Sequence, residues 1–181
     1  VYELPVDLAT PPGAFRVWVR VHPSDAWAGL PLLDAGDKTL GYDVDIGSVT
    51  VAPPQHLVAP EELAIGQRLD ALLTPYLHLV GYDLAAGPYR PGDRLHLSLY
   101  WQGLAAEAAH HARLTLALEH EGTLVFTQDE AIVRGAPLAQ GWPVGAVFRG
   151  QYDLALPLDL PNGDYALRVG LTAPTTWQTV T

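Results

Sequence analysis

The feature that most constrains the fold of this chain is an alternation of apolar and polar residues with period two. In residues 94–99, Leu95, Leu97 and Leu99 alternate with an arginine, a histidine and a serine. The same alternation marks residues 114–119 and 165–171. Because successive side chains of a strand point to opposite faces, each segment is predicted to be a half-buried β-strand with one solvated face.

Shorter apolar segments add further strand candidates. They cover residues 2–6, 15–21, 46–51, 78–82, 123–127 and 148–156. Turn-forming residues separate the candidates, as in Arg-Pro-Gly-Asp at 90–93 and Pro-Asn-Gly-Asp at 161–164. Closely spaced strands without crossover helices predict an all-β fold, an antiparallel β-sandwich that is either immunoglobulin-like or jelly-roll-like.

The chain also repeats itself at an offset of 150 positions, which places Tyr2 on Tyr152 and Phe15 on Tyr165. Without gaps, apolar positions and a turn then coincide: Leu4, Leu8, Pro11, Gly13 and Val19 fall on Leu154, Leu158, Pro161, Gly163 and Val169. A chance likeness between two hairpins is the alternative. Identities at both core and turn positions instead predict a partial tandem repeat.

The repeat suggests three parts. Residues 1–55 are predicted to be the closing half of a preceding β-sandwich module, and residues 75–181 the main module. Residues 56–74 are expected to form a linker in which Pro60 opens a short helix. The main module is expected to lack its last strand. The strand around Val49 then fills that place, within the chain or by exchange between chains, and an unpaired edge is the alternative.

The sequence begins at Val1 inside a predicted strand and contains no methionine, which predicts an excised or processed fragment. The first half-module buries too little apolar surface to stand alone. We therefore expect it to dock on the next module or on another chain, for instance in a strand-swapped homodimer.

Composition excludes several functions. The formal net charge is -10, and the ten Lys and Arg residues are scattered singly, so neither nucleic acid nor an anionic membrane surface is an expected partner. The absence of cysteine excludes disulfides, thiolate metal sites and cysteine nucleophiles. No apolar run approaches the roughly 20 residues that a membrane-spanning helix requires.

Two clusters of candidate metal ligands have simpler explanations. His110 and His111 are adjacent, and adjacent residues on a strand point to opposite faces, so no zinc site is predicted with the nearby His120. Asp34 and Asp37 offer oxygen ligands for calcium, but a hairpin turn with capping carboxylates is the preferred interpretation. We predict no cofactor, with calcium at these two aspartates as the alternative.

Carboxylates for glycoside hydrolysis would have to come from Asp129, Glu130, Asp153 and Asp159, and no spacing brings two of them to one cleft. The sequence contains no Gly-x-Ser-x-Gly elbow, no phosphate-binding loop and no dinucleotide glycine pattern. We expect no catalytic residue in this chain.

Tryptophans are the feature that best marks a ligand surface, because exposed aromatic rings stack on sugar rings. The candidate ligand-binding residues are Trp18, Trp27, Trp101 and Trp142. Trp18 alternates with two valines and is predicted to face outward. In the competing interpretation Trp101 and Trp142 pack at the ends of the sandwich, and Trp18 packs on a neighbouring module.

Two stretches resemble a repeated module from the extracytoplasmic C-terminal regions of bacterial membrane glycosyltransferases of the dolichyl-phosphate-mannose mannosyltransferase type. The first runs from residue 77 (LHLVGYDL) through RPGD at 90–93 to LYWQ at 99–102, and the second from residue 141 (GWPVG) to 171. Residues 1–52 resemble the end of the same module. The resemblance implies a periplasmic or cell-surface appendage beside a catalytic membrane domain, and it carries over no catalytic residue.

We therefore expect a non-catalytic interaction or spacer module whose partners are neighbouring modules of the same protein. The alternative is a carbohydrate-binding module that holds a glycan on exposed tryptophans. A hydrolase, the third hypothesis, requires two convergent carboxylates in a pocket.

Overall fold

The computed structural model describes residues 3, 5–23, 29–85, 87–105, 113–133, 143–171 and 177–180. Within these ranges the regular structure consists of strands and one 3₁₀ turn, with no α-helix. The chain divides into a larger unit, residues 1–11 and 54–181, and a smaller unit, residues 12–53. The predicted all-β class is confirmed.

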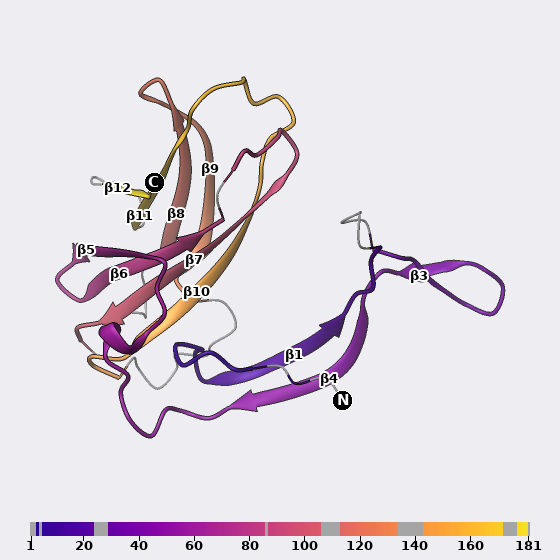
Figure 1. Cartoon of the computed structure of the whole chain (residues 1–181), viewed down its shortest axis with the longest axis horizontal. Helices are drawn as coiled ribbons and strands as arrows, with labels where there is room; N and C mark the ends of the chain where they lie inside the picture. Colours follow the sequence, from indigo (N-terminus) through magenta and orange to yellow (C-terminus); the bar gives the residue numbers. More distant parts are fainter. Residues whose placement is uncertain are drawn as a thin grey trace. The chain divides into compact units, whose positions relative to one another are not determined.

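Two four-stranded antiparallel sheets form the larger unit (Figure 1). The first has the order β10-β7-β6-β5, with bounds Val147–Ala155, Arg94–Gly103, Leu77–Leu84 and Gln67–Thr74. The second has the order β12-β11-β8-β9, with bounds Gln178–Val180, Ala166–Leu171, Arg113–His120 and Thr123–Ala131. Apolar side chains from both sheets pack into one buried cluster, as in a β-sandwich.

The strand order identifies the type of sandwich. Of the seven strands from β6 to β12, β7 (the second) pairs with β10 (the fifth), and β8 (the third) pairs with β11 (the sixth). This Greek-key connectivity is immunoglobulin-like. Immediately before β11, the Tyr165 hydroxyl donates to the Pro161 carbonyl oxygen at 2.6 Å. Such a tyrosine corner is a hallmark of the same fold.

The period-two alternation produces the core. Leu95, Leu97 and Leu99 on β7 are buried, and Trp101 continues their face with an exposed fraction of 0%. The Trp101 indole Nε1 donates to the Tyr152 hydroxyl at 3.1 Å, and that hydroxyl donates to the carbonyl oxygen of Ile132. The polar atoms of two large aromatic side chains are thus satisfied inside the core, as buried polar groups require.

The predicted linker at residues 56–74 is wrong in its second half. Gln67–Thr74 is β5, paired antiparallel with β6 at the edge of the first sheet. Leu69 and Leu73 are partly buried on the same face as Ala71, whereas Leu72 is an apolar residue on the exposed face, so the sequence does not show the alternation of this strand. Only a single 3₁₀ turn, Pro60–Glu62, forms where the short helix was expected.

A second, smaller apolar cluster covers one end of the outer face of the first sheet. It joins Ala9 and Leu63, from the two segments that flank the smaller unit in sequence, to Val80, Tyr100 and Val147 of the sheet. Glycine is required at position 81 because a Cβ there would clash with the Ile65 side chain and the Gln67 carbonyl oxygen. Residues 1–11 therefore belong to the main sandwich, and the predicted boundary at residue 55 is wrong for them.

The smaller unit consists of two antiparallel strand pairs. One pair joins β1 (Gly13–Val19) to β4 (Val44–Val51), and we call it the β1–β4 ribbon. The other joins β2 (Leu32–Leu33) to β3 (Thr39–Gly41). No described residue between 12 and 53 is buried. By itself this unit has no hydrophobic core within the described part of the chain.

Local backbone geometry supports the internal repeat. Turns lie at residues 8–9 and at 158–159, 150 positions apart. Gly13 and Gly163 both have positive φ, at 152° and 156°, a conformation that favours glycine. The ribbon is then the counterpart of the β11–β12 hairpin, since β4 pairs with β1 as β12 pairs with β11.

Three predictions about strands fail. The main sandwich does not lack its last strand, because β12 pairs with β11 at the edge of the second sheet. The strand around Val49 pairs with β1 inside the smaller unit, so within this chain it does not complete the main sandwich. The predicted strand at residues 2–6 is also wrong, because its described residues 3, 5 and 6 lie outside any strand.

Candidate functional site

A polar cleft of about 370 Å³ lies on the solvated face of the first sheet. Its polar walls are Asp83, His96, Ser98, Gln151 and Asp153. Strand register brings them together, because Ser98 on β7 lies between Asp83 on β6 and Gln151 on β10. His96 and Asp153 form the next cross-strand pair on the same face.

The His96 and Asp153 side chains pair directly. His96 Nδ1 lies 2.5 Å from Asp153 Oδ1, and both side chains are exposed. The backbone carbonyl oxygen of Asp153 accepts a hydrogen bond from the Gln128 amide at 3.3 Å. The Asp153 carboxylate thus orients the imidazole at the rim of the cleft, and the Ser98 hydroxyl and Gln151 amide supply neutral hydrogen-bonding groups.

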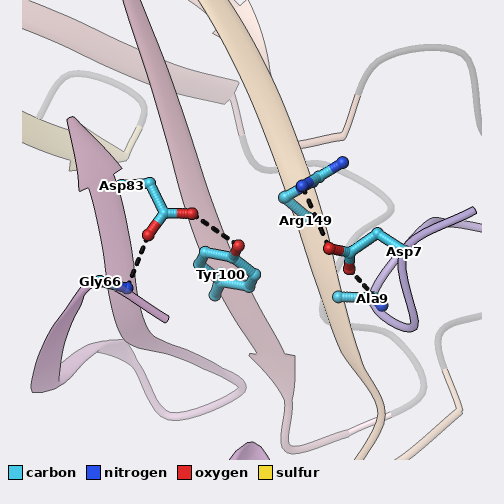
Figure 2. A network of polar contacts seen from close by, with 6 residues as sticks. All are labelled: Asp7, Ala9, Gly66, Asp83, Tyr100 and Arg149. Carbon is cyan, nitrogen blue, oxygen red and sulfur yellow. Dashed lines mark hydrogen bonds and ion pairs between the residues drawn. The ribbon is translucent and has the colours of Figure 1, made fainter. Parts of the chain in front are cut away.

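Asp83 has a structural task beside the cleft. Figure 2 shows its carboxylate between two donors: the Gly66 amide donates to Oδ1 at 2.6 Å, and the Tyr100 hydroxyl donates to Oδ2 at 2.7 Å. Both carboxylate oxygens are therefore engaged in joining the start of β5 to β7. We call this arrangement the Asp83 clamp.

Tyr100 is the titratable group most affected by this environment. Burial, followed by the hydrogen bond to Asp83 and the charge of Asp83, raises the pKa of Tyr100 to about 12. Arg149, its register partner on β10, opposes the shift. Arg149 also pairs with Asp7 at 3.2 Å, and Asp7 accepts the Ala9 amide at 2.8 Å, which ties residues 5–11 to β10 (Figure 2).

The four candidate tryptophans lie in different environments, and two of them lie outside the described residues. Trp101 is a core residue with no exposed surface, so its prediction as a ligand-binding residue is wrong, and its packing role is confirmed. Trp18 faces outward as predicted, with 53% of its surface exposed. The Arg16 guanidinium lies 5.0 Å from the Trp18 ring centroid and occupies one face of the ring. Trp27 and Trp142 lie outside the described residues.

The aspartates of the smaller unit have local partners. Asp34 Oδ1 accepts the amides of Gly36 and Lys38 at 2.8 and 3.0 Å, which confirms the capped hairpin turn. Arg20 forms a bidentate pair with Asp43 at 2.7 and 2.6 Å, which lowers the pKa of Asp43 from its ordinary value. Arg16 pairs with Asp45.

The remaining candidates for metal binding and hydrolysis do not converge. The His120 ring stacks on Tyr165 with centroids 4.7 Å apart, while His110 and His111 lie outside the described residues. Within the described part of the chain, no three His, Cys, Asp or Glu residues are grouped so that they could hold a metal ion. Asp129 accepts the Thr115 hydroxyl, and of the four carboxylates considered for hydrolysis only Asp153 lines the cleft.

The β1–β4 ribbon exposes a row of large apolar side chains. They are Val19, Val44, Ile46 and Val49, with exposed fractions of 41%, 41%, 61% and 49%. In the register of the ribbon Val19 lies opposite Val44, and Val49 lies opposite Phe15. A contiguous apolar surface of this kind marks an interaction site more often than a ligand pocket.

Sequence reasoning missed the cleft and the apolar ribbon for different reasons. The cleft collects outward-facing residues from three strands, and only the register between those strands reveals it. The ribbon was hard to detect because Asp43 and Asp45 flank Val44, so its exposed apolar residues do not form a continuous run in the sequence.

No helix in the described ranges is long and apolar enough to cross a membrane. Comparison of the chain with protein-family models, with curated proteins and with solved structures finds no match.

Proposed function

We propose that this chain is a non-catalytic interaction or spacer module that acts through its β1–β4 ribbon. The observation that carries the proposal is the absence of any buried residue among the described residues of the smaller unit, although that unit is rich in valine, leucine and isoleucine. A two-stranded ribbon is at best marginally stable in water, and its exposed apolar side chains gain free energy when a partner covers them.

Features of the cleft support a non-catalytic role. Hydrolysis of a glycosidic bond uses two carboxyl groups that face the substrate. Asp83 and Asp153 line the same cleft, but both oxygens of Asp83 are held by the Gly66 amide and the Tyr100 hydroxyl. The clamp therefore uses the carboxylate that a hydrolase would require.

The proposed location of the module and its proposed neighbouring domains rest on the resemblance to modules of bacterial membrane glycosyltransferases. A repeated sandwich beside a membrane glycosyltransferase would lie in the periplasm or at the cell surface, with neighbouring modules as partners. Detection of an epitope on this chain in cells of the native host that are intact, or permeabilised only at the outer membrane, tests that location. Detection only after permeabilisation of the inner membrane contradicts it.

Dye binding tests the ribbon. We expect the chain to bind an apolar fluorescent dye, and we expect Ile46→Lys combined with Val49→Lys to remove most of the signal, because both residues are exposed on the ribbon. Leu158→Lys is the control, since Leu158 is an apolar residue of the larger unit that is even more exposed than Ile46 and Val49. Equal loss in both variants, or no dye binding at all, contradicts the proposal.

Glycan binding at the cleft is the second candidate. The cleft presents a hydroxyl, an amide, an imidazole and a carboxylate, which are the groups that hydrogen-bond sugar hydroxyls. Calorimetric titration with a panel of oligosaccharides tests it. Ser98→Ala and Gln151→Ala should each weaken affinity about three- to tenfold, whereas Trp18→Ala should weaken it only if the ring of Trp18 is the binding platform.

A further inference from the structure

We propose that the unpaired edge of β1 binds an antiparallel strand of the β8 type, supplied by an incomplete β-sandwich module of the same repeat. This inference rests on the proposed interaction function and names its partner. It follows from comparing the ribbon with its counterpart in the larger unit.

The two hairpins occupy the same position in the repeat. Gly13 before the first and Gly163 before the second share one unusual backbone conformation. Val17 of β1 pairs with β4, and Leu167, its counterpart 150 positions later, pairs with β12. The ribbon is therefore built as the last hairpin of an immunoglobulin-like sandwich.

In the larger unit, that hairpin has a second neighbour. The other edge of β11 pairs with β8, where Leu167 lies opposite Leu118 and Val169 lies opposite Leu116. Of the described strands, only β4 pairs with β1, so the other edge of β1 presents its backbone donors and acceptors without a strand partner. An open edge of this kind is a template for strand addition.

Transfer of the register predicts which residues meet. Val17 and Val19 of β1 take the places of Leu167 and Val169, and each would lie opposite a leucine of the incoming strand. Arg16 takes the place of Ala166, which lies directly opposite Glu119. Apolar pairs and an unlike-charge pair would thus face each other across the new ladder, and both kinds of pair stabilise sheets.

The same comparison excludes an intact copy of this chain as the donor. In the larger unit, β8 lies between β11 and β9 and has no free edge. The partner must therefore be a module whose β8-type strand lacks a β11-type neighbour. The ribbon would complete it by donating the closing hairpin.

A synthetic hairpin with the sequence of residues 113–131 is the probe, because it carries β8 and β9 without their β11 neighbour. Hydrogen exchange of the full chain is followed by mass spectrometry with and without this peptide. We expect exchange in residues 13–19 to slow about tenfold or more, while exchange in residues 166–171 stays unchanged.

Two matched variants define the site. Val19→Lys places a charge on the apolar face of β1 and should abolish the slowing, whereas Leu158→Lys in the larger unit should leave it intact. A control peptide with lysine in place of Leu116 and Leu118 should not protect the chain. Because Val19 and Leu158 are both exposed, neither substitution is expected to unfold the chain.

Each contrary outcome has a distinct meaning. If the peptide has no effect at concentrations of about 1 mM, the β8-type partner is excluded. If residues 13–19 become protected without peptide as the chain is concentrated, the partner is a second copy, so this inference fails while the interaction function stands. If they exchange slowly in dilute chain alone, the ribbon needs no partner and both proposals fail.

Discussion

Strands β1 and β11 lie at matching positions when the sequence is compared with itself at an offset of 150 residues, yet their surroundings differ completely. Val169 on β11 has no exposed surface, whereas Val19 on β1 is 41% exposed. Both positions hold valine, and each strand is paired along one edge, β1 with β4 and β11 with β12. Burial in this fold is therefore decided by the strands that surround a hairpin and not by the hairpin sequence.

The largest expected effect tests that difference directly. Val169→Asp places an unpaired charge in the core and should destabilise the larger unit by about 3–5 kcal/mol. Val19→Asp should change the free energy of unfolding by less than about 0.5 kcal/mol. Urea unfolding followed by circular dichroism measures both, and similar losses in the two variants would show that β1 is packed in solution.

Loss of the Asp83 clamp should have the next largest effect on the free energy of unfolding. The described contacts of the ribbon include no counterpart of this clamp. Tyr100→Phe removes the hydrogen bond to a carboxylate and should cost about 1.5–3 kcal/mol in the free energy of unfolding. The same urea titration measures this loss. Phe126→Tyr, which alters a partly buried ring of the second sheet and leaves the clamp intact, serves as a comparison.

The titration of Tyr100 is a second test of the stabilisation by the Asp83 clamp. Its pKa is raised from 10.0 to about 12 in the folded chain. The stabilisation is therefore complete below pH 10 and is lost as the pH rises toward 12, because the unfolded chain releases the proton first. Tyrosinate absorbance should show a group that titrates near pH 12 and that Tyr100→Phe removes, whereas Tyr89, whose pKa is also raised by burial, remains in the variant. A wild-type titration without that group would contradict the clamp.

The tyrosine corner should have a smaller effect. Tyr165→Phe removes the hydrogen bond to the Pro161 carbonyl oxygen, which is exposed, and should cost about 1 kcal/mol in thermal or urea unfolding. The ribbon carries Phe15 at this position and lacks the hydroxyl already. Exchange rates in residues 13–19 should therefore be unchanged in the variant, and altered rates would mean that the two hairpins are coupled.

The smallest effect concerns the exposed pair of Arg20 and Asp43 in the smaller unit. Hydrogen bonding to Arg20 lowers the pKa of Asp43 below its ordinary 3.8. The pair thus contributes above pH 3.8, and its contribution is lost as the pH falls through the lowered pKa. Carboxyl chemical shifts should give a midpoint below 3.8 that Arg20→Gln raises. An unchanged midpoint would contradict the pair.

The main strands could be predicted from the sequence because apolar and polar residues alternate along them. Leu95, Leu97 and Leu99 are buried as the alternation predicts, and Trp101 extends the same face. β5 was taken for linker and helix because Leu72 is apolar although it lies on the exposed face, which hides the alternation in the sequence. β12 spans only three residues, too few for any periodicity to appear.

The candidate site was less predictable for a physical reason. Asp83, Ser98 and Gln151 are outward-facing residues on three strands that are far apart in the sequence. Polar residues are common at the outward positions of a sheet with one solvated face. Their residue types therefore do not indicate that a cleft is present. These three residues come together only because β7 pairs with β6 on one side and with β10 on the other.

The attachment of the N-terminal segment determines the order in which this fold assembles. Asp7 contacts Arg149, a residue 142 positions later in the chain, and the Ala9 carbonyl oxygen accepts the Arg149 amide at 2.7 Å. Closing so long a loop is entropically costly until the local hairpins have formed. We therefore expect residues 5–11 to join the sheet after β7 and β10 have paired, and to detach early when the chain begins to unfold.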